Sequence, residues 1–125
     1  MQSMYPVLKY EDARAAIDFL ERAFGFESHA VYDGEKGGVA HAELRLGGEF
    51  VMLGSTSEGQ ERFNQGAGRT SVYVAVDDPD ALCARAREAG AAIEQEPADQ
   101  DYGSRDFTAR DPEGNLWSFG TYRPS

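Results

Sequence analysis

The residues best suited to chemistry in this sequence are His41 and Glu43, which lie two positions apart in a strand expected over Val39 to Leu46. Alternate side chains of a strand point to the same face, so both are expected to project to one side. There they can supply two metal ligands, or a general base and its carboxylate partner. The alternative is a histidine that lines a pocket or is held by a neighbouring group.

A second chemical candidate is Arg105, whose guanidinium can bind a ligand carboxylate or phosphate through two parallel hydrogen bonds. Its alternative is an ion pair with Glu43 or another acidic side chain. Aromatic side chains can sandwich a planar ligand, or they can simply fill the interior of the fold. The aromatic candidates are Tyr5, Tyr73, Tyr102, Phe50 and Phe107.

The elements that must position these residues follow a pattern that occurs twice. Residues 48–53 match residues 114–119 at a shift of 66, and each segment follows an expected turn. The same shift aligns Asp12 with Asp78, and each aspartate is suited to cap the start of a helix. Pro79 suits the first position of the second helix. This agreement between distant turns and caps predicts an internal duplication.

Each half is expected to fold as β-α-β-β-β. The expected strands are Met4–Tyr10, Phe26–Tyr32, Val39–Leu46 and Phe50–Leu53 in the first half, and Ser71–Val76, Ala92–Glu96, Arg105–Ala109 and Leu116–Phe119 in the second. Gly25 and Gly90 are expected to end the two helices, and Pro97 to end the strand before an acidic loop over residues 98–102.

The fold class expected from this order is α+β, with two tandem βαβββ modules. Module 1 spans residues 1–55, a polar linker spans 56–69, and module 2 spans 70–125, all within one domain. Each module must bury one sheet face under its helix, and the other faces can curve as a half-barrel mixed sheet around a shared cavity.

Strand alternation divides the side chains between these two faces. The helix-covered face is expected to contain Leu8, Leu44, Leu46, Val51, Leu53, Val72, Val74, Val76, Trp117 and Phe119. The cavity face is expected to contain Tyr5, Val7, Lys9, His41, Glu43, Arg45, Phe50, Met52, Ser71, Tyr73, Arg105, Phe107, Leu116 and Ser118. Its mixture of aromatic, thioether, hydroxyl and charged groups suits an apolar organic ligand with a few polar handles.

The overall charge narrows the class of partner. The sequence has 12 Lys and Arg against 22 Asp and Glu, a formal net charge of −10. This balance disfavours nucleic acids and anionic membranes, and it favours cationic ligands. No basic segment followed by an apolar run opens the sequence, no apolar stretch approaches the ~20 residues of a membrane span, and Cys83 is the single cysteine. We therefore expect a cytoplasmic protein.

The paired modules and the Asp111-Pro-Glu-Gly-Asn115 turn resemble the vicinal oxygen chelate superfamily. The flanking segments, residues 102–107 and 117–120, are most similar to its small bacterial glyoxalase and bleomycin-resistance branch. The superfamily includes glyoxalase I, extradiol dioxygenases, fosfomycin-resistance enzymes and bleomycin-binding proteins. The resemblance implies a glyoxalase-like fold over nearly the whole chain, and a homodimer with cavities at or near the subunit contact.

Enzymes of this superfamily hold a divalent metal through His, Gln or Glu on the first and fourth strands of each module. The residues at those positions in this sequence are Tyr5, Met52, Ser71 and Ser118. A phenol, a thioether and two neutral hydroxyls are a poor ligand set for such an ion. The resemblance therefore implies a protein without the usual metal site, although a divalent metal held elsewhere remains an alternative.

The expected function is binding of a small organic molecule in an aromatic-lined cavity, as in a protein that sequesters a bleomycin-type antibiotic. The expected ligand-binding residues are Tyr5, His41, Glu43, Phe50, Met52, Ser71, Tyr73, Tyr102, Arg105, Phe107 and Ser118. The alternative is a glyoxalase-like, metal-dependent lyase or isomerase that uses His41 and Glu43 as catalytic residues.

Overall fold

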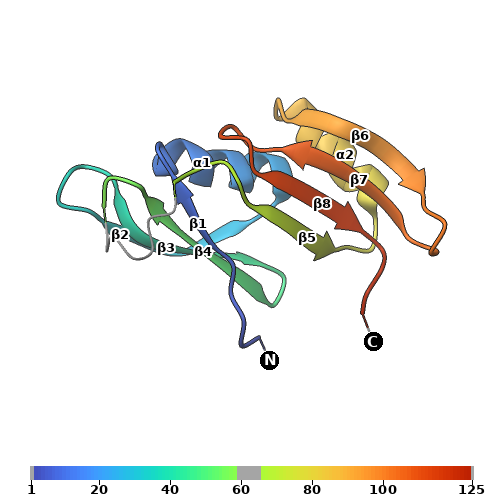
Figure 1. The fold of residues 1–125 in the computed structure, drawn as a ribbon, viewed down its shortest axis with the longest axis horizontal. Helices are drawn as coiled ribbons and strands as arrows, with labels where there is room; N and C mark the ends of the chain where they lie inside the picture. The colour runs from blue at the N-terminus through green and yellow to red at the C-terminus, as the bar shows by residue number, and fades with distance from the viewer. Residues whose placement is uncertain (1, 59–65, 125) are drawn as a thin grey trace.

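The computed structural model describes residues 2–58 and 66–124 and contains the two expected βαβββ modules (Figure 1). The first module consists of β1 (Val7–Tyr10), α1 (Ala13–Phe19), the π-helical turn η1 (Leu20–Phe24), β2 (Glu27–Asp33), β3 (Val39–Leu46) and β4 (Glu49–Ser55). The second consists of β5 (Ser71–Ala75), α2 (Pro79–Glu88), β6 (Ala92–Asp99), β7 (Arg105–Arg110) and β8 (Leu116–Gly120). Part of the expected linker, residues 59–65, lies outside the described residues.

Each module forms its own four-stranded mixed sheet. The strand orders are β1-β4-β3-β2 and β5-β8-β7-β6, so the two sheets have the same topology. The β1–β4 and β5–β8 pairs are parallel, and the remaining pairs are antiparallel. The predicted α+β class, with two βαβββ modules, is confirmed.

The helix starts form as the capping residues predict. The Asp12 carboxylate accepts a hydrogen bond from the Ala15 amide at 3.1 Å, and the Asp78 carboxylate accepts one from Ala81 at the same distance. Each bond satisfies an amide that has no partner within its helix. At the end of η1, Gly25 has the left-handed φ of 84° that a helix terminus commonly requires.

The two helices are joined by Arg85 of α2. Its guanidinium donates to the backbone oxygens of Glu21 and Arg22, each at 3.1 Å. Carbonyls in the last turn of a helix lack intrahelical partners, so this arginine caps η1 from the other module. The change from α1 to the wider π-helical turn was not predicted from the sequence.

The second module departs from the sequence expectation in β6. The strand continues past Pro97 to Asp99 instead of ending at Glu96. Its register with β7 is irregular between Gln95 and Ala98, where the proline has no amide to donate. Because β6 is the edge of its sheet, the missing hydrogen bond does not break an inner ladder.

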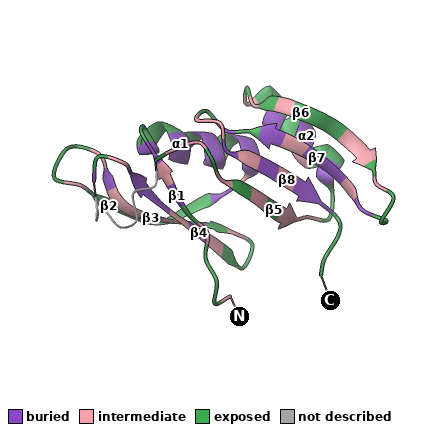
Figure 2. Cartoon of the chain, viewed as in Figure 1, coloured by how far each residue is buried: buried purple, intermediate pink, exposed green. Residues whose placement is uncertain are grey.

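The modules share one hydrophobic core. Phe24, at the end of the first module's helix, lies with its ring centroid 5.6 Å from that of Trp117 and 4.7 Å from that of Phe119 on β8. All three side chains are buried, and Figure 2 shows buried residues along α1, β7 and β8, with exposed residues along β6. The first module's helix therefore packs against the second module's sheet as well as its own.

The turn between β7 and β8 is held by the buried carboxylate of Asp111. Its Oδ2 atom accepts hydrogen bonds from the Tyr10 hydroxyl at 2.6 Å, Asn115 Nδ2 at 3.0 Å and Trp117 Nε1 at 3.1 Å. Its Oδ1 atom accepts from the amides of Glu113 and Asn115, both at 3.1 Å. Burial, followed by the nearby Asp111 charge, raises the pKa of Tyr10 above its usual value. The turn is thus anchored to the first module.

Candidate functional site

A groove of about 810 Å³ lies between the two modules. The first module contributes Leu46, Phe50 and Val51 to it, and the second contributes Val72, Tyr73 and Val74. Its volume falls within the range typical of ligand pockets, and its lining combines apolar side chains with several polar and charged ones. Of the residues predicted to bind a ligand, Phe50 and Tyr73 line this groove. None of the other predicted residues is among those that line it.

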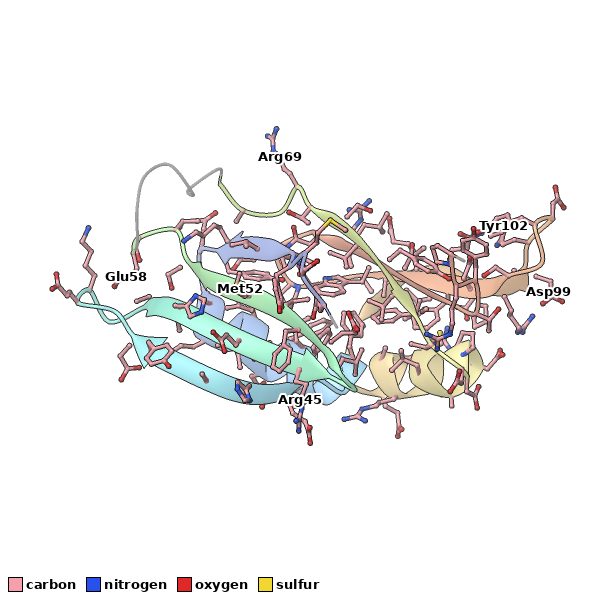
Figure 3. All side chains as sticks on the ribbon, turned by 90° about the horizontal axis from the view of Figure 1, so that it is seen from below. Arg45, Met52, Glu58, Arg69, Asp99 and Tyr102 are labelled. Atoms are coloured by element: carbon pink, nitrogen blue, oxygen red, sulfur yellow. The ribbon has the colours of Figure 1, made fainter. Side chains whose placement is uncertain are left out.

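The uncovered face of the first sheet carries His41 and Glu43, as predicted. His41 Nε2 lies 3.0 Å from Glu43 Oε2, and the Tyr32 ring stacks on the imidazole with a centroid distance of 6.0 Å. Met52 is paired with Glu43 across β3 and β4, so it lies on the same face, where Figure 3 shows it with Arg45. A half-buried imidazole beside a carboxylate can exchange a proton with a bound molecule.

On β1 and β5, the residues that lie opposite Met52 and Ser118 are not the two that the resemblance placed at the metal-ligand positions, Tyr5 and Ser71. Tyr5 precedes β1 and is exposed. Its hydroxyl donates a hydrogen bond to the Gln2 backbone oxygen at 3.0 Å. The residue directly opposite Met52 is Val7, and the residue opposite Ser118 is Tyr73. Ser71 lies opposite Leu116.

None of these side chains offers an imidazole or carboxylate, so the donor set does not fit a divalent ion. Within residues 2–58 and 66–124, no group of three or more His, Cys, Asp and Glu side chains is arranged to hold a metal.

The predicted orientation of β7 is wrong. Phe107 was expected on the cavity face, but it is fully buried in the core and stacks on Phe119 at a centroid distance of 5.2 Å. Arg105 lies on the same side of β7, toward α2. Its guanidinium donates to both Asp80 carboxylate oxygens, at 2.7 and 2.9 Å, and to Asp99 at 3.3 Å. The ion-pair alternative therefore describes Arg105, with Asp80 and Asp99 in place of Glu43.

The cause is one additional residue in the second hairpin. Leu44 pairs with Val51 across residues 45–50, whereas Ala109 pairs with Trp117 across residues 110–116. The shift of 66 therefore holds for β8 but becomes 65 for β7, and a one-residue change reverses the two faces of a strand. The structural counterparts of His41 and Glu43 are accordingly Asp106 and Thr108, whereas a uniform shift of 66 would give Phe107 and Ala109.

Asp106 and Tyr122 form part of a site that the sequence reasoning missed. Asp106 is buried, and its carboxylate accepts hydrogen bonds from the Tyr102 hydroxyl and the Gln100 amide, each at 3.0 Å. The Tyr102 and Tyr122 rings meet edge to face at 5.9 Å, and the Tyr73 hydroxyl donates to the Tyr122 backbone oxygen at 2.7 Å. We call Tyr73, Tyr102, Tyr122 and Asp106 the tyrosine–aspartate cluster.

The hydrogen bond to Asp106 raises the pKa of Tyr102 above its usual value of 10.0. Figure 3 shows Tyr102 beside the β6–β7 end of the molecule, away from Met52 on the first sheet. Had the register of β7 with β8 been predicted correctly, the sequence would have placed Asp106 on the uncovered face. Tyr122 follows the last strand and gave no periodic signal.

The chain belongs to the Glyoxalase/Bleomycin resistance protein/Dioxygenase superfamily, whose family model matches residues 5–119. This confirms the resemblance to the vicinal oxygen chelate superfamily. The chain is also similar to the uncharacterized protein Rv0887c of Mycobacterium tuberculosis, with 32% identity over 124 residues that cover 94% of this chain and 73% of that protein.

Two solved structures show the same fold. TioX from Micromonospora sp. ML1 is 34% identical with a TM-score of 0.79, and the match covers 97% of this chain and 100% of that one. Glyoxalase I from Zea mays is 20% identical with a TM-score of 0.76, and the match covers 99% of this chain and 46% of the maize chain. The maize likeness concerns the fold alone. None of the described helices is long and apolar enough to cross a membrane.

Proposed function

We propose that this protein binds a small organic molecule in the groove between its modules and acts by sequestering a drug of the bleomycin type. The observation that carries the proposal is the groove itself, which has the volume of a ligand pocket and places Phe50 and Tyr73 on its wall. The net charge of −10 favours a cationic guest, as bleomycin-type glycopeptides are. We further propose that the protein works in the cytoplasm.

The test is calorimetric titration with metal-free bleomycin and with planar aromatic cations, on a blocked and an unblocked groove. Gly48 lines the groove, and a Cβ at this position meets no atom within 4 Å, so a larger residue can enter the open space. Gly48→Phe should abolish binding by filling the groove, whereas Gly48→Ser, at the same position, should retain it. Phe50→Ala should weaken binding roughly tenfold by removing an aromatic wall.

Tyr32→Ala is the control for loss of an exposed aromatic residue, because Tyr32 does not line the groove. Its affinity should equal that of the wild type. Absence of binding across these compounds would contradict the proposal, and so would equal affinity of Gly48→Phe and Gly48→Ser.

A second function, that of a glyoxalase-like lyase or isomerase, is favoured by the contact between His41 Nε2 and Glu43 Oε2 at 3.0 Å. In this proposal His41 moves a proton of the substrate, and the Glu43 carboxylate orients the imidazole. The assay uses the hemithioacetal of methylglyoxal and glutathione, with and without added nickel or zinc. Activity lost in both His41→Gln and Glu43→Gln, but kept in Tyr32→Phe, would support it.

Elemental analysis of dialysed protein separates the two functions further. Stoichiometric metal that is lost in His41→Ala would favour the lyase and count against metal-free sequestration. Wild-type activity in His41→Gln would exclude the proposed catalytic role.

We also propose that the protein is a homodimer. Strands β1, β2, β5 and β6 are the edges of the two sheets, and an edge strand offers unpaired backbone groups to a second chain. Two of these edge strands expose a hydrophobic side chain, Val7 on β1 and Tyr73 on β5. Light scattering should give twice the chain mass of 13.7 kDa. A mass equal to that of one chain across the concentration range would contradict the dimer.

A further inference from the structure

The tyrosine–aspartate cluster contains a buried carboxylate that has no basic partner among the described residues. Asp106 is only 8% exposed, and its two oxygens accept hydrogen bonds from neutral groups, Gln100 Nε2 and the Tyr102 hydroxyl. No Lys, Arg or His nitrogen among the described residues lies within 4.0 Å of this carboxylate. The polar partners of this carboxylate in the described part of the chain are therefore neutral groups.

Three exposed aromatic rings accompany the Asp106 carboxylate. Tyr73, Tyr102 and Tyr122 are 42%, 63% and 47% exposed, which is high for large aromatic side chains. Gly120 brings the parts together, since a Cβ there would lie 2.7 Å from Asp106 Cβ and 2.8 Å from the Tyr73 hydroxyl oxygen. Any side chain at this position would displace the aspartate or the tyrosine. The glycine thus allows the Asp106 side chain and the Tyr73 hydroxyl to lie close together.

We propose that the tyrosine–aspartate cluster binds the ammonium group of a small organic cation, above all a methylated one. Aromatic faces attract cations through the ring quadrupole, and methyl groups on nitrogen add apolar contact with the same rings. The Asp106 charge supplies long-range attraction through Tyr102. The site goes beyond the proposed drug binding: it shares Tyr73 with the groove lining, but Tyr102, Tyr122 and Asp106 lie outside that lining.

The experiment compares choline with 3,3-dimethyl-1-butanol, in which a carbon replaces the charged nitrogen while size and shape are kept. Ligand-observed NMR on the full-length protein measures both affinities. Choline should bind saturably and at least about tenfold more tightly than the alcohol. Its methyl protons should shift upfield, because protons over an aromatic face are shielded; general attraction to an acidic surface does not produce that shift.

Variants locate the site. Tyr102→Leu and Tyr122→Leu should each weaken choline binding roughly two- to fivefold, as expected for loss of one exposed cation–π contact. Tyr32→Leu, which removes an exposed tyrosine from the first module, is the matched control and should bind choline as the wild type does. Asp106→Asn should weaken binding most, with circular dichroism used to verify that it remains folded.

Equal binding of choline and the alcohol would overturn the proposal, as would an unshifted methyl signal. Equal weakening by Tyr32→Leu and Tyr102→Leu would also overturn it. The groove is tested separately: wild-type choline binding in Gly48→Phe is expected here, whatever that variant shows for bleomycin-type compounds.

Discussion

Strands β3 and β7 occupy equivalent places in the two modules but expose different chemistry. On β3 the uncovered face carries His41 and Glu43, which contact each other at 3.0 Å and are partly open to solvent. On β7 the corresponding residues are Asp106 and Thr108, and the aspartate is buried behind Tyr102 and Gln100. The covered faces are largely apolar in both modules, with Arg105 at the start of β7 as a charged exception. The two modules therefore share an apolar core, while their uncovered faces differ: one carries an imidazole–carboxylate pair and the other a buried carboxylate.

The largest effect on stability is expected on the covered face of β7, which can be compared with its uncovered face by single mutations. Phe107→Ala should lower the free energy of unfolding by about 3–5 kcal/mol, because it removes a fully buried ring stacked on Phe119. Thr108→Ala, one residue away on the uncovered face, should change it by less than about 1 kcal/mol. Urea denaturation followed by Trp117 fluorescence measures both values. A larger loss for Thr108→Ala would mean that the faces of β7 are assigned the wrong way round.

An intermediate effect is expected from the bond that attaches the second hairpin to the first module. Tyr10→Phe should cost about 1–2 kcal/mol at neutral pH, because Asp111 Oδ2 loses the hydroxyl at 2.6 Å. The pKa of Tyr10 is raised in the folded protein, so above about pH 10 the unfolded chain loses this proton first. The contribution of the hydroxyl is therefore complete below pH 10 and declines above it.

Denaturation curves at neutral pH and above pH 10 should accordingly show a smaller difference between the wild type and Tyr10→Phe at the higher pH. Tyr32→Phe serves as the control. The Tyr32 ring is exposed and stacks on His41, on the uncovered face of the first sheet, away from the Tyr10–Asp111 hydrogen bond. A difference that stays constant with pH would contradict the raised pKa.

The smallest effect is expected at Arg105, which ties β7 to α2 on the covered side. Asp80→Asn should lower the urea midpoint slightly, and the loss should diminish in about 1 M salt, where exposed ion pairs are screened. The hydrogen bond from Arg105 lowers the pKa of Asp80 below its usual 3.8. The carboxylate therefore stabilises the fold above that pH and loses its effect as the pH falls further. Midpoints of the two proteins that remain apart in strong acid would contradict this assignment.

Most of the fold could be predicted because its signals are local. Asp12 and Asp78 cap their helices, Gly25 ends the first helix in a left-handed conformation, and Gly114 turns the second hairpin with a φ of 94°. Each of these signals depends on a few adjacent residues. The assignment of the covered face was also correct for β8, where Trp117 and Phe119 are buried.

The site was harder to predict because it depends on register and on distant contacts. A single extra residue in the second hairpin shifts the register of β7, so that Phe107 faces the core and Asp106 faces the other side of the sheet. The contact between Tyr73 and Tyr122 joins residues 49 positions apart, beyond the reach of strand periodicity. Phe50 and Tyr73 were expected on a cavity wall, and both line the groove between the modules. Val72 and Val74 also line it, because β5 is an edge strand that the helices cover only in part.

The packing of Phe24 against Trp117 and Phe119 has a consequence for how the chain can be divided. Each module supplies apolar surface that the other must cover. The hydrogen bond from Tyr10 to Asp111 adds a buried polar contact between the two modules. Two separately produced fragments, cut between the modules, would each expose half of a core. They should fold only on meeting each other, as a complementing pair whose reassembly restores the protected environment of the single tryptophan.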